Sequence, residues 1–366
     1  MMNVVPCANQ YLNYLRKEGI IEWINYSAGR NSRLYRLCDE GKTEYRAISD
    51  RKIIRRIEQN NYKIRLGNSK KYPHLNKSIR KVELDYAGAL KTVELEYNNN
   101  LDNNNAEGRR TFSYAAISKI ESGEIYFKVN ATNGRLDSNY TSLPGELLKH
   151  LTIDGQPLRE MDISNAQPFF VVALFRPTLE IENLMRKFLG NSLTMLVKTL
   201  DIFECEDVKR YTLLVTTGKF YDFMMTKFKE HNITFTGRKD LKQQLFVVFF
   251  GKNYAYKYSP AAKLFKRIFP NVQRLFDTIK KDHYNKLAIF LQRIESYTML
   301  ERVTKNIELE LPELPLLTKH DSVLPFGSFT IMVGKDMDKV KTIMVNTIKE
   351  VIGFAPQGRM KKYPKI

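Results

Sequence analysis

The chain has 366 residues, of which 43% are hydrophobic, and a formal net charge of +19 at pH 7 from 59 Lys and Arg against 40 Asp and Glu. This length suffices for two or three packed domains, and the positive charge predicts a polyanionic partner, although a generally basic surface would give the same count. The widely spaced Cys7, Cys38 and Cys205 argue against a disulfide framework or a zinc cluster, and no apolar run approaches the roughly 18 residues of a membrane span. We therefore expect an intracellular protein without membrane contact.

Residues 1–45 have the pattern of a small helix-hairpin unit. We predict a helix at residues 11–22, extended arms at 23–25 and 34–37, and a turn rich in small residues and cations at 26–33. A helix followed by a basic hairpin is typical of a winged-helix-like element that contacts phosphates. An ordinary connection with solvated arginines fits equally well.

Residues 46–130 form a second, strongly cationic segment. Residues 49–98 have a mainly helical pattern, and residues 98–106 are a polar, asparagine-rich run typical of a loop. The acidic pair Glu83 and Asp85 lacks the further carboxylates of a proofreading nuclease. We therefore interpret this pair as surface charge.

Two aspartates stand where predicted strands end. Asp162 lies in R-E-M-D-I-S-N-A-Q-P, after a strand-like stretch at 151–161 and before a helix-like one, and Asp321 lies in P-L-L-T-K-H-D-S-V-L-P, at the bend of a predicted β-hairpin. A helix cap and a turn residue are the simplest roles for them. Two carboxylates at strand ends also suit a two-metal phosphoryl-transfer site, because Mg²⁺ takes one or two carboxylates and leaves its other positions to phosphates and water.

A predicted helix at residues 238–250 lies between these aspartates in the sequence. Residues four apart lie one above another on a helix, so one stripe combines two cations with two aromatic rings, which suits a triphosphate carrying a base and a sugar. An amphipathic helix with a basic edge is the alternative. The stripe consists of Arg238, Lys242, Phe246 and Phe250, and the face predicted to pack in the core consists of Leu241, Leu245, Val248 and Phe249.

These segments resemble, in order, the motifs of family A DNA polymerases, the class of bacterial DNA polymerase I. T-N-G-R-L-D-S-N-Y-T-S-L-P at 132–144 resembles the segment T-x-G-R-L-x-S…N-L-P, and D-I-S-N-A-Q at 162–167 resembles motif A, D-Y-S-Q-x-E. Residues 238–251 are similar to motif B, R-x3-K-x3-F-x3-Y-G. H-D-S at 320–322 resembles motif C in the form that single-subunit phage-type RNA polymerases carry, whereas DNA polymerases carry H-D-E. Residues 217–222 more weakly resemble a short G-D-x-H type element between motifs A and B.

The resemblance covers residues 131–366, including a closing helix predicted at 335–351 and a tail at 353–366. It implies an α+β, right-hand polymerase with an antiparallel-sheet palm and helical fingers at 131–366, and a helical, thumb-like region at 46–130. The interval between motifs B and C is shorter than in the bacterial enzyme, which puts part of the fingers in doubt.

The resemblance also implies a role for each matching residue. Two Mg²⁺ ions would be bound by the aspartates, and the triphosphate by the two cations of the predicted helix. His320 is more typical of a packing or hydrogen-bonding partner than of a metal ligand. The implied catalytic residues are Asp162, Asp321, Arg238 and Lys242; those lining the nucleotide pocket are Gln167, Phe246, Phe250 and Gly251; those contacting nucleic acid are Arg135, Gln292 and His320.

Two departures from the family concern the sugar of the incoming nucleotide. Gln167 stands where DNA polymerases have glutamate and phage-type RNA polymerases have glycine, and Phe250 stands where both have tyrosine. Gln167 keeps the bulk of the glutamate, but Phe250 lacks the tyrosine hydroxyl that could support it. We therefore predict a preference for deoxynucleotides that is weaker than in a typical family A enzyme.

The sequence therefore predicts a DNA polymerase without proofreading that extends a DNA primer-template with dNTPs. We expect it in the cytoplasm of a host cell, in the replication of a phage, plasmid or other mobile element, with replication accessory proteins as candidate partners. A single-subunit RNA polymerase or primase is the alternative among enzymes. A DNA-binding replication-initiation protein without catalysis is the alternative from another class.

Overall fold

The computed structural model describes residues 8–24, 34–38, 51–56, 70–101, 105–235, 237–252, 258–327 and 331–362. The chain forms two compact units, residues 1–70 and residues 71–366. None of the helices in these ranges combines the length and the apolar character that crossing a bilayer requires. The segment boundaries predicted at residues 45 and 130 remain predictions.

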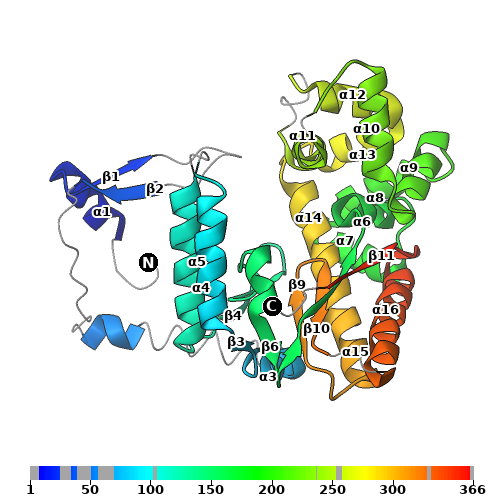
Figure 1. Cartoon of the computed structure of the whole chain (residues 1–366). Coiled ribbons are helices and arrows are strands. Elements are labelled where there is room, and N and C mark those ends of the chain that lie inside the picture. Colours follow the sequence, from blue (N-terminus) through cyan, green and yellow to red (C-terminus); the bar gives the residue numbers. More distant parts are fainter. Residues whose placement is uncertain are drawn as a thin grey trace. The chain divides into compact units, whose positions relative to one another are not determined.

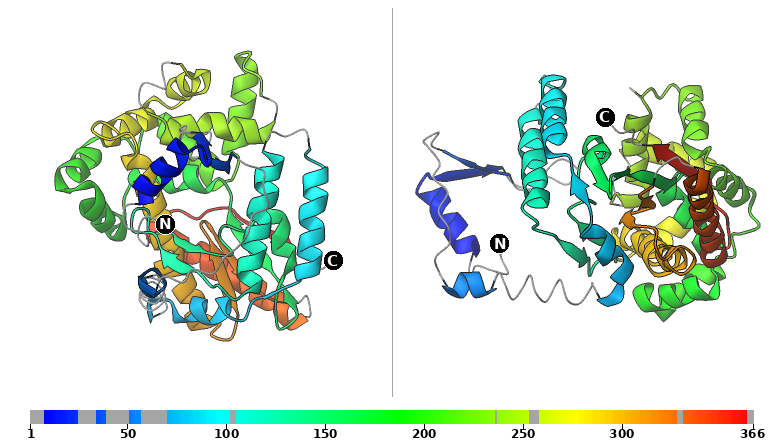
Figure 2. Two further views of the ribbon diagram at one scale, coloured as in Figure 1. Left: turned by 90° about the vertical axis from the view of Figure 1, so that its left-hand side faces the viewer. Right: turned by 60° about the horizontal axis from the view of Figure 1, so that its bottom comes forward.

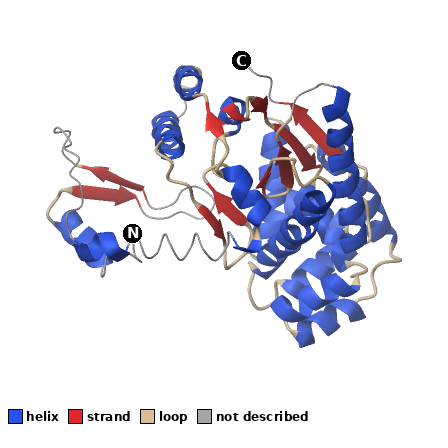
Figure 3. Cartoon of the chain, turned by 90° about the horizontal axis from the view of Figure 1, so that it is seen from below, coloured by secondary structure: helices blue, strands red, loops and turns tan. Residues whose placement is uncertain are grey.

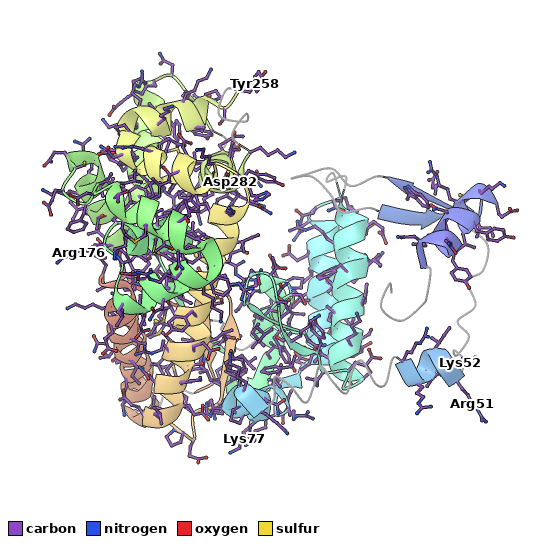
Figure 4. The ribbon with its side chains drawn as sticks, turned by 180° about the vertical axis from the view of Figure 1, so that it is seen from behind. Arg51, Lys52, Lys77, Arg176, Tyr258 and Asp282 are labelled. Atoms are coloured by element: carbon purple, nitrogen blue, oxygen red, sulfur yellow. The ribbon has the colours of Figure 1, made fainter. Side chains whose placement is uncertain are left out.

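The first unit contains a helix and an antiparallel strand pair. Helix α1 (Ala8–Lys17) ends earlier than predicted, before the left-handed Gly19, and β1 (Ile21–Ile24) pairs with β2 (Leu34–Leu37). The Arg16 guanidinium lies 4.5 Å from the centre of the Trp23 ring. The predicted basic turn at 26–33 lies outside the described residues. A further helical stretch at 51–56 carries the exposed cations Arg51 and Lys52 (Figure 4).

The first part of the second unit contains two long helices, α4 (Tyr86–Asn98) and α5 (Ala106–Glu121), that lie side by side (Figures 1 and 2). Asp85 caps the first of them by accepting a hydrogen bond from the Gly88 amide. The predicted loop at 98–106 is described only in part, and Ala106 already belongs to the second helix. The elements of this region are α3 (Pro73–Ile79), β3 (Glu83–Leu84), α4 (Tyr86–Asn98), α5 (Ala106–Glu121), β4 (Phe127–Val129), β5 (Leu136–Ser138) and η1 (Gly145–His150).

The stretch predicted as one strand, residues 151–161, consists of a hairpin and the start of a separate strand. Strand β6 (Leu151–Ile153) turns into β7 (Gln156–Pro157) through Asp154 and Gly155, which both have positive φ, and β8 (Arg159–Ile163) follows. Asp-Gly is a preferred sequence for such a two-residue turn because both positions need a left-handed backbone. The prediction of a continuous strand was therefore wrong.

An antiparallel four-stranded sheet, in the order β11-β8-β10-β9, forms the centre of the second unit (Figure 1). Strand β9 (Leu316–Lys319) and β10 (Ser322–Pro325) form the predicted hairpin. The predicted tail contributes β11 (Gly358–Lys362), which pairs with β8 along its whole length. The sequence therefore predicted the hairpin correctly and missed one edge of the sheet.

Helices pack beside this sheet and continue beyond it (Figure 3). The run from α14 through the π-helical segment η4 to α15 is continuous, and α16 packs against its later part. An α+β fold with an antiparallel sheet is confirmed. The remaining elements are α6 (Ala166–Phe170), η2 (Val171–Leu174), α7 (Leu179–Leu189), α8 (Asn191–Thr199), α9 (Glu206–Thr216), α10 (Phe220–Glu230), α11 (Arg238–Phe250), α12 (Pro260–Ile268), α13 (Pro270–Ile279), α14 (Lys286–Ser296), η4 (Tyr297–Val303), α15 (Thr304–Glu310) and α16 (Ile331–Ile352).

Aromatic side chains fill the core between these helices. The buried Tyr211 ring meets four phenylalanine rings edge-on, an arrangement that the quadrupoles of aromatic rings favour, and its hydroxyl donates to the Pro168 carbonyl at 2.9 Å. The bond ties α9 to α6, the helix that follows Asp162. The four rings belong to Phe175, Phe220, Phe265 and Phe269.

We predict that Tyr211→Phe lowers the free energy of unfolding by about 1 kcal/mol, because the ring remains while the buried Pro168 carbonyl loses a donor. Urea unfolding followed by circular dichroism measures the change. Leu213→Ala is the control on the same helix, since Leu213 is 63% exposed, and should change stability by less than about 0.5 kcal/mol. Equal stability of Tyr211→Phe and the wild type would contradict the prediction.

Candidate functional site

The antiparallel pairing of β8 and β10 brings the two predicted aspartates together. Asp162 on β8 lies opposite Ser322, the residue that follows Asp321. Facing residues in such a pair have Cα atoms roughly 4.5–5.5 Å apart, so the two carboxylates belong to one end of the sheet. Both residues are partly buried.

The two carboxylates interact electrostatically. Burial raises the pKa of Asp321 to about 6; a backbone hydrogen bond lowers this pKa and the negative charge of Asp162 raises it further. Desolvation and a neighbouring like charge both disfavour an ionised carboxyl group. The site therefore attracts cations.

His320 and Asp321 form the two-residue turn of the β9–β10 hairpin, between the paired Lys319 and Ser322. His320 adopts the left-handed conformation with φ 56°, which the tight turn imposes. Burial lowers the pKa of His320 to about 4, and the charges of Arg135 and Lys319 act in the same direction. His320 is therefore neutral at physiological pH.

Glu295 is a buried acid near this pair that the sequence analysis did not single out. Its side chain is only 1% exposed and accepts hydrogen bonds from Arg135 Nε at 2.7 Å and Arg135 Nη2 at 2.9 Å. The Gln167 amide nitrogen also donates to it. Burial raises the pKa of Glu295 to about 7; Arg135 opposes this shift, and the charge of Asp321 adds to it. The sequence signal that could have identified Glu295 is its place next to the apolar Ile294, four residues after the apolar Leu291, on what the structure shows to be the buried face of α14.

The Arg135 turn, residues 131–135, is fixed against the same helix. Arg293 Nε donates to the Thr132 carbonyl at 2.8 Å, and Ser296 Oγ donates to the Asn133 carbonyl at 3.0 Å. Gly134 has a left-handed φ of 76°, and a Cβ there would lie 2.5 Å from Ser296 Oγ. The turn therefore needs glycine for both its conformation and its close approach.

The structure does not bring Gln292 into this network. Gln292 lies half-buried on α14, one turn before Glu295, and its side chain makes no hydrogen bond with a residue in the described ranges. Arg135 directs two of its N–H groups to Glu295, which limits how many remain for nucleic acid. The nucleic-acid roles of both residues stay predictions.

Helix α11 carries the predicted cationic stripe, and the start of α10 contacts it. Lys242 Nζ lies 5.1 Å from the centre of the Tyr221 ring, and Arg238 Nη1 lies 3.4 Å from Asp222 Oδ1. Burial raises the pKa of Tyr221, with the charges of Arg238 lowering it and Asp321 raising it. Tyr221 therefore interacts with Asp321 of the aspartate pair and with both cations of the stripe, a role that sequence reasoning missed.

The turn before α10 packs directly against the segment that follows Asp162. Gly218 has a left-handed φ of 71°, and a Cβ there would lie 2.2 Å from Gln357 Oε1 and 3.2 Å from Ser164 Cβ. Residues 217–222 therefore lie beside the aspartates, although their resemblance to a known motif is weak.

The far end of the stripe is aromatic. The Phe246 and Phe250 rings lie 5.2 Å apart, and both stay partly exposed. The buried Lys280 Nζ donates to the Val248 carbonyl at 2.6 Å, so this lysine caps the C-terminal end of α11. A Cβ at Gly251 would lie 2.4 Å from the Val247 carbonyl oxygen. The opposite face of α11 is buried, which confirms the predicted core residues Leu241, Leu245, Val248 and Phe249.

Several buried polar atoms around the aspartates have no hydrogen-bond partner among the described residues. Buried polar groups are usually satisfied, and unsatisfied ones commonly indicate a water, an ion or a ligand. The atoms in this region are Ser164 Oγ, Asn165 Nδ2, Gln167 Oε1 and His320 Nδ1.

The donor set suits a hard divalent cation that keeps ligands from its substrate. Asp162 and Asp321 offer carboxylate oxygens; burial is the main cause of the raised pKa of Asp321 and the charge of Asp162 adds to it, and a bound cation would offset both. Within the described ranges no three His, Cys, Asp or Glu side chains form a complete metal cage. Mg²⁺ requires only one or two carboxylates besides phosphates and water, so these residues fit it.

Comparisons with known proteins give only weak likenesses to solved structures. No family model matches the chain, and no curated protein does. The solved structures include the POL domain of Pol1 from M. smegmatis in complex with DNA primer-template and dNTP, which is 14% identical, with a TM-score of 0.38. The match covers 70% of this chain and 51% of that one, so the chain spans about half of its length. A likeness at this level does not establish the function.

We predict that, without divalent cations, the free energy of unfolding falls as pH rises from about 4 to 8. The folded-state pKa values of Asp321 (about 6) and Glu295 (about 7) exceed the ordinary 3.8 and 4.5, so the folded state binds protons more tightly. Their contribution is complete below the ordinary values and is lost as pH rises through the raised ones. At 1.36 kcal/mol per pKa unit, it amounts to about 3 kcal/mol for each group.

Urea titrations across this pH range measure the slope, which Asp321→Asn should reduce. Added Mg²⁺ should stabilise the wild type above pH 7 and leave Asp321→Asn unchanged. A wild-type slope that is flat, or equal stabilisation of both proteins by Mg²⁺, would contradict this assignment.

Proposed function

We propose that this protein is a nucleotidyltransferase that extends a primer 3′-hydroxyl with nucleoside triphosphates on a DNA template. One observation carries the proposal: the pairing of β8 with β10 brings Asp162 next to the turn that carries Asp321, while Tyr221 interacts both with Asp321 and with the cations of α11. Phosphoryl transfer needs positioning and charge stabilisation more than covalent chemistry from the protein. A pair of acids close to a row of cations can provide both the positioning and the charge stabilisation.

In this proposal Asp162 and Asp321 hold two Mg²⁺ ions, which, when bound, increase the acidity of the primer 3′-hydroxyl and neutralise phosphate charge. Arg238 and Lys242 bind the β- and γ-phosphates and stabilise the pyrophosphate as it leaves. The Tyr221 ring supports the Lys242 ammonium. Arg238 exchanges its exposed contact with Asp222 for phosphate oxygens.

The aromatic end of the stripe is the proposed place of the base and the sugar. Phe246 and Phe250 provide a surface on which the base can stack. Gly251, which has no side chain, allows the backbone to pass close to the Val247 carbonyl oxygen at the end of α11. Gln167, held by Glu295, supplies bulk beside the sugar. We propose palm and fingers for residues 131–366, and nucleic-acid contacts for the basic residues before them.

An RNA polymerase or primase is the second candidate, favoured by the H-D-S sequence at residues 320–322. A replication-initiation protein that binds DNA without catalysis is the third. Primer extension with labelled dNTPs and then rNTPs separates all three, since the third binds primer-template and extends nothing.

We predict that Asp162→Asn and Asp321→Asn each reduce extension to below a few per cent of wild type. Affinity for primer-template should change little, because contacts to phosphates elsewhere provide most of the binding free energy. Single-turnover extension and a fluorescence binding titration measure the two properties. Asp222→Asn is a neighbouring acid control and should retain extension. Substantial extension by either aspartate variant would refute the assignment.

We also predict that Gln167→Gly increases the use of rNTPs relative to dNTPs by at least about tenfold, equivalent to about 1.4 kcal/mol of lost discrimination. Removing the side chain opens space beside the 2′ position. Single-nucleotide kinetics with matched dNTP and rNTP measure the ratio. A wild type that prefers rNTPs would instead favour the RNA polymerase or primase, and an unchanged ratio in the variant would place discrimination elsewhere.

A further inference from the structure

The Gln167 amide has one end bound and one end unbound. Its nitrogen donates to Glu295 Oε2, while its carbonyl oxygen, Oε1, is buried and accepts no hydrogen bond from the described residues. Gln167 is the second residue of α6, four residues after the end of the strand that carries Asp162. An unsatisfied acceptor therefore lies close to the paired aspartates.

Glu295 fixes which end of the amide faces it. Arg135 donates to both Glu295 oxygens, so above pH 7, where this carboxylate is ionised, it only accepts hydrogen bonds. Turning the Gln167 amide over would place its oxygen against the Glu295 oxygens. Because Glu295 is 1% exposed, water cannot compensate for that contact, and Gln167 must keep its oxygen turned away.

Resting on the proposed function, we propose that Glu295 determines sugar recognition by positioning Gln167, whose Oε1 accepts a hydrogen bond from a hydroxyl group of the incoming nucleotide's sugar. Gln167 then recognises the sugar by an acceptor as well as by bulk. The 2′-hydroxyl and the 3′-hydroxyl are both donors of the required chemistry. A 2′ contact increases the use of rNTPs, and a 3′ contact disfavours dideoxynucleotides.

The test is single-turnover incorporation of dNTP, rNTP and ddNTP at pH 8 by the wild type and Gln167→Met, which keeps the bulk and removes the acceptor. Loss of one hydrogen bond should change one ratio of kcat/KM by about fivefold. A 2′ contact predicts a lower rNTP/dNTP ratio, and a 3′ contact predicts a lower dNTP/ddNTP ratio. If both ratios stay at their wild-type values, the inference is overturned.

Glu295→Gln tests the positioning role. The new amide can donate to Gln167 Oε1, which allows the Gln167 amide to turn its nitrogen toward the sugar. Glu295→Gln should therefore shift the same ratio as Gln167→Met, and combining the two variants should give no additional shift. A purely structural role would reduce activity with all three nucleotides equally and add in the double variant, which would overturn the proposal. If Glu295→Gln does not fold, the effect of Gln167→Met on the two sugar ratios decides whether the inference stands.

Gln273 provides a matched control elsewhere in the fold. Its amide nitrogen donates to Asp277 Oδ1 at 2.8 Å, and its buried Oε1 also lacks a partner among the described residues. Gln273→Met should leave both sugar ratios unchanged; a shift equal to that of Gln167→Met would overturn the inference. If the wild type binds primer-template and incorporates nothing, the proposed function fails and this inference with it. If it incorporates nucleotides with ratios that Gln167→Met does not alter, only this inference fails.

Discussion

The repulsion between Asp162 and Asp321 is the constraint on which the rest of the site depends. Strand pairing forces the two acids to one end of the sheet, where burial raises the pKa of Asp321 and the charge of Asp162 raises this pKa further. A sheet built only for stability would avoid two like charges at this position. Their retention is understandable when a cation and phosphates complete the charge balance, because the same negative charge that destabilises the isolated protein then binds the ligand.

The surrounding elements hold this unfavourable arrangement in place. Arg135 and Glu295 form a buried, doubly hydrogen-bonded ion pair beside the aspartates, and the Arg135 turn is tied to α14 through Arg293 and Ser296. Gly218 allows the start of α10 to pack directly on the segment after Asp162. The site is thus assembled from segments far apart in the sequence, which are anchored by side-chain hydrogen bonds to backbone carbonyls or by a glycine that leaves no room for a side chain.

Helix α11 shows how one helix serves both the core and the site. Its buried leucines, valine and phenylalanine fix its rotation, so that Arg238 and Lys242 face Tyr221 and Asp222. The buried Lys280 fixes its other end through the Val248 carbonyl. Burial lowers the pKa of Lys280 to about 8, a cost that the carbonyl contacts offset in part. The helix that carries the cations and rings of the stripe is therefore held in one orientation by its packing.

The sequence by itself determined the local features: the hairpin bearing Asp321, the two faces of α11, and the closing helix near residues 335–351, because hydrophobic periodicity and turn residues are short-range signals. Only the tertiary structure decided what is non-local. Glu295, Tyr221 and Lys280 belong to the site or support it through residues distant in sequence, and no spacing rule indicates which distant partners they meet. The edge strand β11 was missed for the same reason, since it is a strand only because β8 offers it hydrogen bonds. The strand predicted at 151–161 failed for a local reason, the Asp154-Gly155 turn, whose chemistry was present in the sequence and was overlooked.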